Sequence, residues 1–267
     1  MDDKKKTVRL GALAGVGLIC CAILAAPPAL AQVDRLTIWD LALGSTLEEM
    51  PAWIEFKDYA CGSNGGPPLQ PLAGWQEYHL CQPDENGLYE VYFEYDDEAE
   101  YILRALNDPR VGRFVGTIDK DFPVMTSALF DADGVLRGVR LITDPRQDFV
   151  NDDFFELAAI RGREDHFLLG PFLGAQFSIN PEADCVNVPL APGEGEVGNA
   201  HIKLNCDRID QEDGVRYILR TRYFRKPGQL ARDPVTNQLT VGQFESSTRA
   251  EVYQIGFGPA GSTLNID

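Results

Sequence analysis

Four cysteines downstream of an apolar leader constrain the fold of this chain more than any other feature. Cys61 and Cys81 enclose 19 residues, Cys185 and Cys206 enclose 20, and more than 100 residues separate the two pairs. Four thiols in an oxidising compartment favour two disulfides, for which three connectivities exist. The similar spacing favours a bond within each pair, and each closed loop is expected to add about 3 kcal/mol of stability. A zinc site is the alternative, but the chain has no C-x-x-C motif and its histidines are scattered.

Residues 1–31 have the organisation of an export signal. Basic residues precede an apolar run over residues 10–26, and Ala29 and Ala31 supply the small-x-small pattern that a signal peptidase cleaves. We therefore expect a mature chain that begins at Gln32 in the periplasm, or alternatively outside the cell. A membrane anchor is the other reading, but 17 residues are at the lower limit of a membrane span and two prolines follow at once. We expect no stable membrane insertion after cleavage.

The net charge limits the class of partner. The full chain carries −17 and the leader +2, so the mature chain carries −19. A polyanion could bind this surface only against Coulomb repulsion, so we expect no nucleic-acid partner and no docking on anionic lipid. The acidity is uneven, because residues 32–148 carry −13 and residues 149–267 carry −6. The apolar fraction of 44% indicates a folded chain all the same.

Two strand-like runs divide the mature chain into similar halves. In each half an acidic turn that closes on glycine, residues 83–87 or 210–214, precedes a β-branched and aromatic run, residues 88–95 or 215–224. The sequence thus predicts an α+β fold of two strand-rich antiparallel modules, each with one disulfide and few short helices. The modules are expected over residues 32–148 and 149–267, with the pattern of an internal duplication.

Further elements are expected within each module. Residues 122–130 and 135–143 indicate a hairpin around an Asp-Ala-Asp-Gly turn, and residues 238–244 and 248–257 indicate two more strands. Capping and dipole patterns predict short helices over residues 45–56, 96–105 and 151–160.

The first module resembles known exported modules. The sequence Gly44-Ser-Thr-Leu-Glu-Glu49 has the form of a helix start, and a later strand ends in Phe130-Asp-Ala-Asp-Gly-Val-Leu136. Residues 36–143 are similar in this plan to the BamE/SmpA-like modules and to the tandem, disulfide-containing modules of β-lactamase inhibitor proteins. The resemblance implies a non-catalytic module that binds other proteins. The chain departs from the family's compact loop by an insertion from Gly62 to Gly74.

The two matching strands have faces of opposite charge. Alternation places Glu90 and Glu94 on one face of the first strand, and it places Arg216, Arg220, Arg222 and Lys226 together on one face of the second. On one reading the basic face is neutralised by acidic residues elsewhere in the chain. On the other, its guanidinium groups receive an anionic ligand or an acidic segment of a partner.

Two polar loops extend this candidate surface. Residues 61–68, Cys-Gly-Ser-Asn-Gly-Gly-Pro-Pro, place Asn64 in a loop tethered by a cysteine, with Trp75 close in sequence. Such a loop on a rigid scaffold suits contact with a protein or peptide, and plain connection is equally consistent. The second loop begins after Phe224 and runs to Gln238.

Motifs for catalysis and metal binding are weak. There is no Gly-x-Ser-x-Gly, and no acidic pair stands out as a glycosidase pair. Asp131 and Asp133 resemble the start of a calcium loop, but the third ligand and the distal Glu are missing, so a hairpin turn is favoured over a calcium cofactor. The sequence predicts a non-catalytic binding or assembly factor for an envelope protein. An exported hydrolase with a carboxylate-based or metal-assisted site is the alternative.

Overall fold

The computed structural model describes residues 37–51, 56–95, 102–103, 105–107, 116–118, 122–144, 166–228 and 244–265. All of them belong to one compact unit, Arg35–Asp267. The expected signal segment and the helix expected over residues 151–160 lie outside the described residues. In the described part of the chain, no helix has the length and apolar character needed to cross a membrane.

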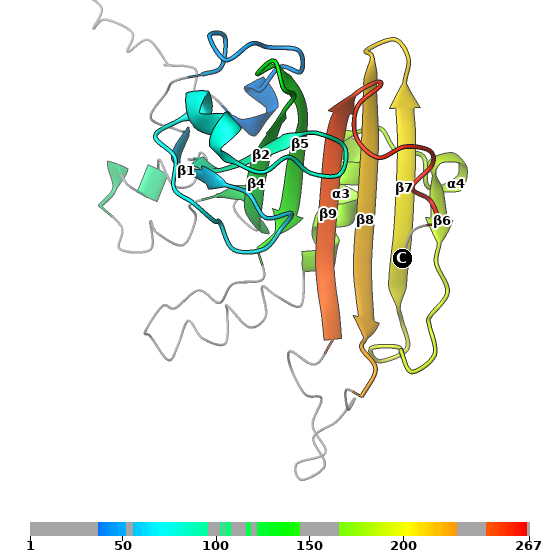
Figure 1. The fold of residues 1–267 in the computed structure, drawn as a ribbon. Helices are drawn as coiled ribbons and strands as arrows, with labels where there is room; N and C mark the ends of the chain where they lie inside the picture. The colour runs from blue at the N-terminus through cyan, green and yellow to red at the C-terminus, as the bar shows by residue number, and fades with distance from the viewer. Residues whose placement is uncertain are drawn as a thin grey trace, which may run out of the picture. The chain divides into compact units, whose positions relative to one another are not determined.

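The strands of both sequence halves form one antiparallel sheet (Figure 1). Its order is β1-β2-β4-β5-β9-β8-β7-β6, with the short β3 (Thr117–Ile118) paired to β4 outside this order. The bounds are β1 Phe56–Cys61, β2 Tyr89–Tyr95, β4 Phe122–Phe130, β5 Leu136–Thr143, β6 Cys185–Asn187, β7 Ile202–Asp210, β8 Val215–Arg225 and β9 Phe244–Gln254.

A central pair of strands joins the two halves of the sheet. Strand β5 pairs with β9 along its length, so that Arg140 faces Glu251 and Leu141 faces Ala250. Both strands carry fully buried apolar residues, so an edge at either would expose core surface. The two halves of the chain therefore form one continuous sheet, whereas the sequence predicts two separate modules.

Several strands agree with the sequence patterns. Strands β2 and β8 confirm the two strand-like runs, and β4 pairs with β5 as the predicted hairpin. Strand β9 is continuous across the break expected at residues 245–247, while residues 238–243 lie outside the described part.

The prediction of a helix over residues 45–56 is wrong for the residues of that range that the structure describes. Residues 47–49 make a turn, in which Glu49 Oε2 accepts hydrogen bonds from Thr46 N at 2.9 Å and Thr46 Oγ1 at 3.1 Å. Residues 102, 103 and 105 of the helix expected over 96–105 are helical.

Short helices cover one face of the sheet. They are α3 (Leu169–Gln176) and α4 (Pro181–Asp184), together with the 3-10 helices η1 (Ile38–Asp40), η2 (Trp75–Leu80) and η4 (His166–Leu168). Helix α3 packs on β8 and β9 and lies behind them in Figure 1. A Cβ on Gly170 would lie 2.1 Å from Thr221 Oγ1, so glycine is required for this close approach.

The core lies between the helices and the sheet and is continuous across both halves. On the first half Trp75 is 2% exposed, packs edge-on to Phe93 at 5.1 Å, and donates Nε1 to Pro51 O at 2.9 Å. On the second half Phe177 stacks on Tyr217 at 4.9 Å. Aromatic contacts therefore fix the helices on this face.

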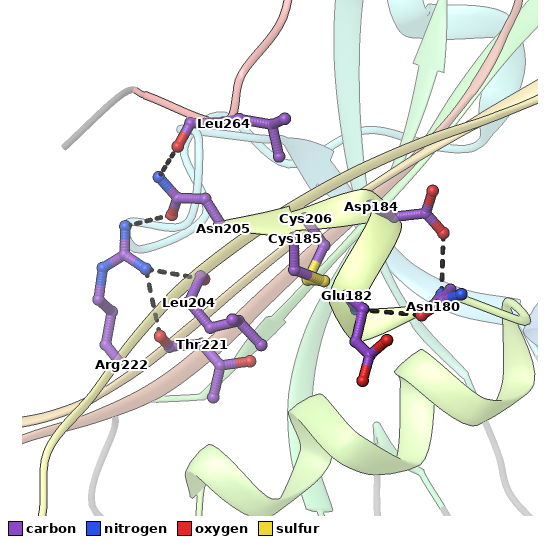
Figure 2. The surroundings of a disulfide bond; sticks show 10 residues. All are labelled: Asn180, Glu182, Asp184, Cys185, Leu204, Asn205, Cys206, Thr221, Arg222 and Leu264. Atoms are coloured by element: carbon purple, nitrogen blue, oxygen red, sulfur yellow. Dashed lines mark hydrogen bonds between the residues drawn. A yellow bond between two sulfur atoms is a disulfide. The ribbon is translucent and has the colours of Figure 1, made fainter. Parts of the chain in front are cut away.

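Two disulfides confirm the pairing predicted from spacing. Cys61 is bonded to Cys81, and Cys185 to Cys206. Cys185 and Cys206 are directly paired residues of β6 and β7, beside α4, whose N-cap Asn180 accepts from Glu182 N at 3.0 Å (Figure 2). Each half of the sheet thus has one covalent link near its outer edge.

Candidate functional site

The side of the sheet opposite α3, here called the polar face, gathers the charged residues singled out in the sequence. Tyr217 and Leu219 of β8 contact the core, so the alternate residues Arg216, Arg220 and Arg222 point to the polar face. On β2, Val91 and Phe93 contact the core, and the alternate residues face the other way. Both predicted face assignments are confirmed. The acidic residues of β2 and the basic residues of β8 therefore project from the same side of one sheet. Strands β4, β5 and β9 lie between β2 and β8.

A buried ion-pair network occupies the middle of the polar face. Arg140 Nη1 lies 2.8 Å from Glu90 Oε2, and Arg140 Nε lies 2.8 Å from Glu251 Oε1. Arg140 Nη2 lies 3.9 Å from Asp84 Oδ2, which is a weak ion pair. Arg249 Nη2 also donates to Glu251 Oε1, at 2.7 Å. Burial would raise the pKa of Glu251, but the Arg249 and Arg140 charges outweigh it and lower that pKa to about 2.

The loop over residues 61–68 lies on this network. Asn64 N donates to Glu90 Oε2 at 2.8 Å, and Asn64 O accepts from Arg249 Nη1 at 3.2 Å. Arg249 Nη2 also donates to Asn64 Oδ1. A Cβ on Gly62 would lie 2.2 Å from Glu90 Cγ, so the loop sits directly on the sheet.

A small cavity lies between this loop and the sheet, beside Arg140. It is lined by Ser63, Tyr92 and Ser127, among others, and has a volume of about 10 Å³. That is about the room of one water molecule, so it has no space for an organic substrate.

The C-terminal segment, residues 255–265, covers the other end of the polar face. Arg216 pairs with Asp207 through Nε at 2.8 Å and Nη2 at 2.7 Å, and its Nη1 donates to Pro259 O at 2.7 Å. Figure 1 shows this segment passing in front of β8 and β7. Arg216 is therefore held by groups of its own chain.

Asn205 connects this covered end to the neighbouring arginine (Figure 2). Its Oδ1 accepts from Arg222 Nη2 at 2.6 Å, and its Nδ2 donates to Leu264 O at 3.0 Å. Arg222 Nη1 also donates to Leu204 O at 3.0 Å. Arg222 is thereby fixed against β7.

Arg220 and Arg249, here called the arginine pair, lie between the covered ends. They are directly opposite each other on β8 and β9. Like charges in that position repel and destabilise a sheet. The Nε atoms of both side chains are buried without a hydrogen-bond partner. Within the described residues, Arg220 makes no hydrogen bond and no ion pair.

The other residues singled out in the sequence lie elsewhere. Lys226 Nζ is 2.5 Å from Glu245 Oε2 at the end of β8. Trp75 belongs to the core, and its burial keeps its side chain from any partner, so it does not join the site. Asp131 Oδ1 accepts from Asp133 N at 2.9 Å, and Asp131 Oδ2 accepts from Arg137 Nε at 2.6 Å, which is the arrangement of a hairpin turn. Over the ranges that the structure describes, no group of three or more His, Cys, Asp or Glu side chains could hold a metal ion.

Five residues of this arrangement were not singled out in the sequence. They are Arg140, Asn205, Asp207, Arg249 and Glu251. Arg249 falls within the strand expected at residues 248–257. Its alternation with Glu251 and Tyr253 could have placed all three side chains on one face of that strand. Arg220 therefore has guanidinium donors without an acceptor among the described residues, whereas both terminal nitrogens of Arg249 already donate to Asn64 or Glu251.

Comparisons with protein families, with curated proteins and with solved structures found no match to this chain.

Proposed function

We propose that this protein is a non-catalytic binding or assembly factor whose polar face receives an acidic segment of a partner protein. The observation that carries the proposal is Arg220, a partly buried guanidinium without an acceptor, directly opposite Arg249. A carboxylate beside Arg220 would offset its charge opposite Arg249 and accept from its unused donors.

The composition of the chain supports this reading. The chain has 41 acidic and 24 basic residues, so acceptors for an arginine are abundant. Even so, Arg216 has Asp207 and Lys226 has Glu245, while Arg220 has no acidic partner in the described part. A buried donor without an acceptor costs about 1–3 kcal/mol, and such a cost is expected where a ligand later supplies the acceptor.

We also propose that the protein is exported and acts in the periplasm, on an envelope protein. The support is the three-part pattern of residues 1–31, and the two disulfides are compatible with an oxidising compartment. N-terminal sequencing of the protein from a periplasmic extract should begin at Gln32. Recovery of an uncleaved chain in the membrane fraction would contradict the proposal.

An internal duplication is a further proposal. Each half of the sheet is a four-stranded meander among the described strands, the last strands of the two meanders are the central pair, and each half has one disulfide. The proposed likeness of residues 36–143 to BamE/SmpA-like or β-lactamase-inhibitor modules belongs with it. Superposition of the two meanders tests it, and a mismatch in strand length and register would count against it.

The binding proposal is tested with a simple acidic probe. Fluorescein-labelled octaglutamate should bind the mature protein in about 0.15 M salt, which screens the net negative charge of the chain beyond about 8 Å, and should raise fluorescence anisotropy, whereas an uncharged Gly-Ser octapeptide should not. Arg220→Gln should lower the affinity at least about tenfold, as expected when a charge-assisted hydrogen bond of about 1.5–3 kcal/mol is lost. Its melting temperature should not fall below that of the wild type, because the side chain has no internal partner to lose and its replacement removes a like charge opposite Arg249.

Arg208→Gln is the matched control. Arg208 belongs to the neighbouring strand β7, but it points to the helix-covered face, where it lies over the Tyr217 ring and pairs with Asp210. Its replacement should lower stability and leave peptide affinity unchanged. The proposal fails if octaglutamate does not bind, or if Arg220→Gln unfolds the protein while Arg208→Gln changes affinity equally.

A further inference from the structure

Asn64 occupies hydrogen-bonding positions on Arg249 that a bound anion could take. It presents two neutral oxygens to one guanidinium, its main-chain O to Arg249 Nη1 and its side-chain Oδ1 to Arg249 Nη2. The same Arg249 Nη2 also donates to Glu251. Two of the Arg249 nitrogens thus meet oxygens from within the chain, and Nε is left buried without a partner.

The loop delivers Asn64 to a fixed position. Cys61 is tied to Cys81, Gly62 N donates to Glu90 O at 2.9 Å, and Asn64 N donates to Glu90 Oε2. Asn64 has a φ of 59°, in the left-handed region that asparagine tolerates better than most residues. The backbone of the loop is therefore anchored to β2, and only the Asn64 side chain can leave Arg249 without disturbing the loop.

The amide oxygen of Asn64 is a weaker acceptor than a carboxylate. Hydrogen bonds from guanidinium to a carboxylate are roughly twice as strong as those to a neutral group. The contact between Asn64 Oδ1 and Arg249 Nη2 is exposed to solvent, so an arriving group can reach it. A carboxylate that binds Arg220 is directly opposite Arg249 and would compete with Asn64 for it.

We infer that Asn64 is an internal competitor for Arg249 that sets the affinity of the arginine pair for an acidic partner. This inference rests on the proposed binding function. The partner carboxylate engages Arg220, and it engages Arg249 fully only when the Asn64 side chain rotates away. Asn64 thereby selects for ionised carboxylates, because a neutral acceptor gains nothing by replacing it.

Two substitutions of Asn64 test this inference in opposite directions. Asn64→Gly keeps the positive φ and the main-chain acceptor but removes Oδ1, so octaglutamate should bind about 2- to 10-fold more tightly. Asn64→Asp supplies an internal carboxylate, so octaglutamate should bind at least about tenfold more weakly. Asn64→Asp should also raise the melting temperature at low salt by about 2–4 °C, and less in 0.5 M salt.

Ser63→Ala is the control in the same loop. Ser63 Oγ donates to Pro67 O at 2.8 Å, so the change alters the loop without removing a contact to Arg249. It should leave octaglutamate affinity unchanged. The inference is overturned if Asn64→Gly binds no more tightly than the wild type, or if Asn64→Asp changes neither affinity nor melting temperature.

The outcomes separate the two proposals. If Arg220→Gln abolishes binding and both Asn64 variants bind like the wild type, the competitor role fails and the binding function stands. If octaglutamate binds neither the wild type nor Asn64→Gly, the binding function fails. In that case a higher melting temperature of Asn64→Asp would still establish that Asn64 occupies an anion position at Arg249, and an unchanged one would overturn both.

Discussion

Replacing Glu251 by Gln removes the carboxylate that Arg140 and Arg249 share, and its effect on stability should depend on pH. Glu251 is 4% exposed and accepts from Arg140 Nε and Arg249 Nη2. Burial alone would raise its pKa, but the two guanidinium charges lower the pKa from 4.5 to about 2. The folded state thus favours the ionised form.

The size of the stability effect follows from the difference between the ordinary pKa of 4.5 and the folded-state pKa of about 2. One pKa unit corresponds to about 1.4 kcal/mol, so ionised Glu251 contributes roughly 3 kcal/mol to the free energy of unfolding at pH 7. Because the folded pKa lies below the unfolded value, this stability is present above about pH 4.5 and is lost as the pH falls toward 2. At pH 2.5 roughly 1 kcal/mol should remain.

Urea unfolding at several pH values checks this expectation. Glu251→Gln should be less stable than the wild type by roughly 3 kcal/mol at pH 7, and the difference should shrink to roughly 1 kcal/mol at pH 2.5. Glu212→Gln, in the exposed turn between β7 and β8, is the control and should change stability by less than about 0.5 kcal/mol. A gap between Glu251→Gln and wild type that is equally large at both pH values would refute the electrostatic reasoning.

Three further variants probe the packing and one disulfide, each by urea unfolding at pH 7. Trp75→Ala should lower stability by about 3–5 kcal/mol, since it removes a core aromatic residue; a smaller loss would mean that the side chain is not buried. The Cys185→Ala and Cys206→Ala double variant, without reductant, should lose about 3 kcal/mol, and no loss would indicate that the bond is absent. Gly138→Ala should cost about 1–3 kcal/mol, because its Cβ would lie 2.8 Å from the buried Tyr253 ring; unchanged stability would place that ring elsewhere.

Local patterns were sufficient for the elements that they describe. The alternation in residues 88–95 and 215–224 correctly predicted both strands and the faces on which their side chains lie, since alternation is a property of the strand itself. Cysteine spacing predicted both disulfides. Strand β7 was missed because Asp207 and Arg208 interrupt its apolar pattern, and the pairing of Asp207 with Arg216 of β8 exists only in the folded sheet.

The candidate site depends on contacts that no local pattern contains. The arginine strand was predicted, but nothing near Arg220 in the sequence indicates that Arg249 lies opposite it. Asn64 and Arg249 are 185 residues apart, so their contact exists only once both meanders share a sheet. Likewise, the position of Trp75 close to the 61–68 loop in the sequence predicts contact with a partner, but the sequence does not indicate that its side chain is buried in the core.

The position of β9 has a consequence for the order in which the molecule can be completed. Strand β9 is the last of the described strands in the chain, yet it lies between β5 and β8 in the middle of the sheet. While the chain emerges from the ribosome, both β5 and β8 are open edges with unpaired main-chain groups. Residues 244–254 close both edges in one step. A chain truncated before residue 244 should therefore be prone to aggregation, and not merely shorter by one strand.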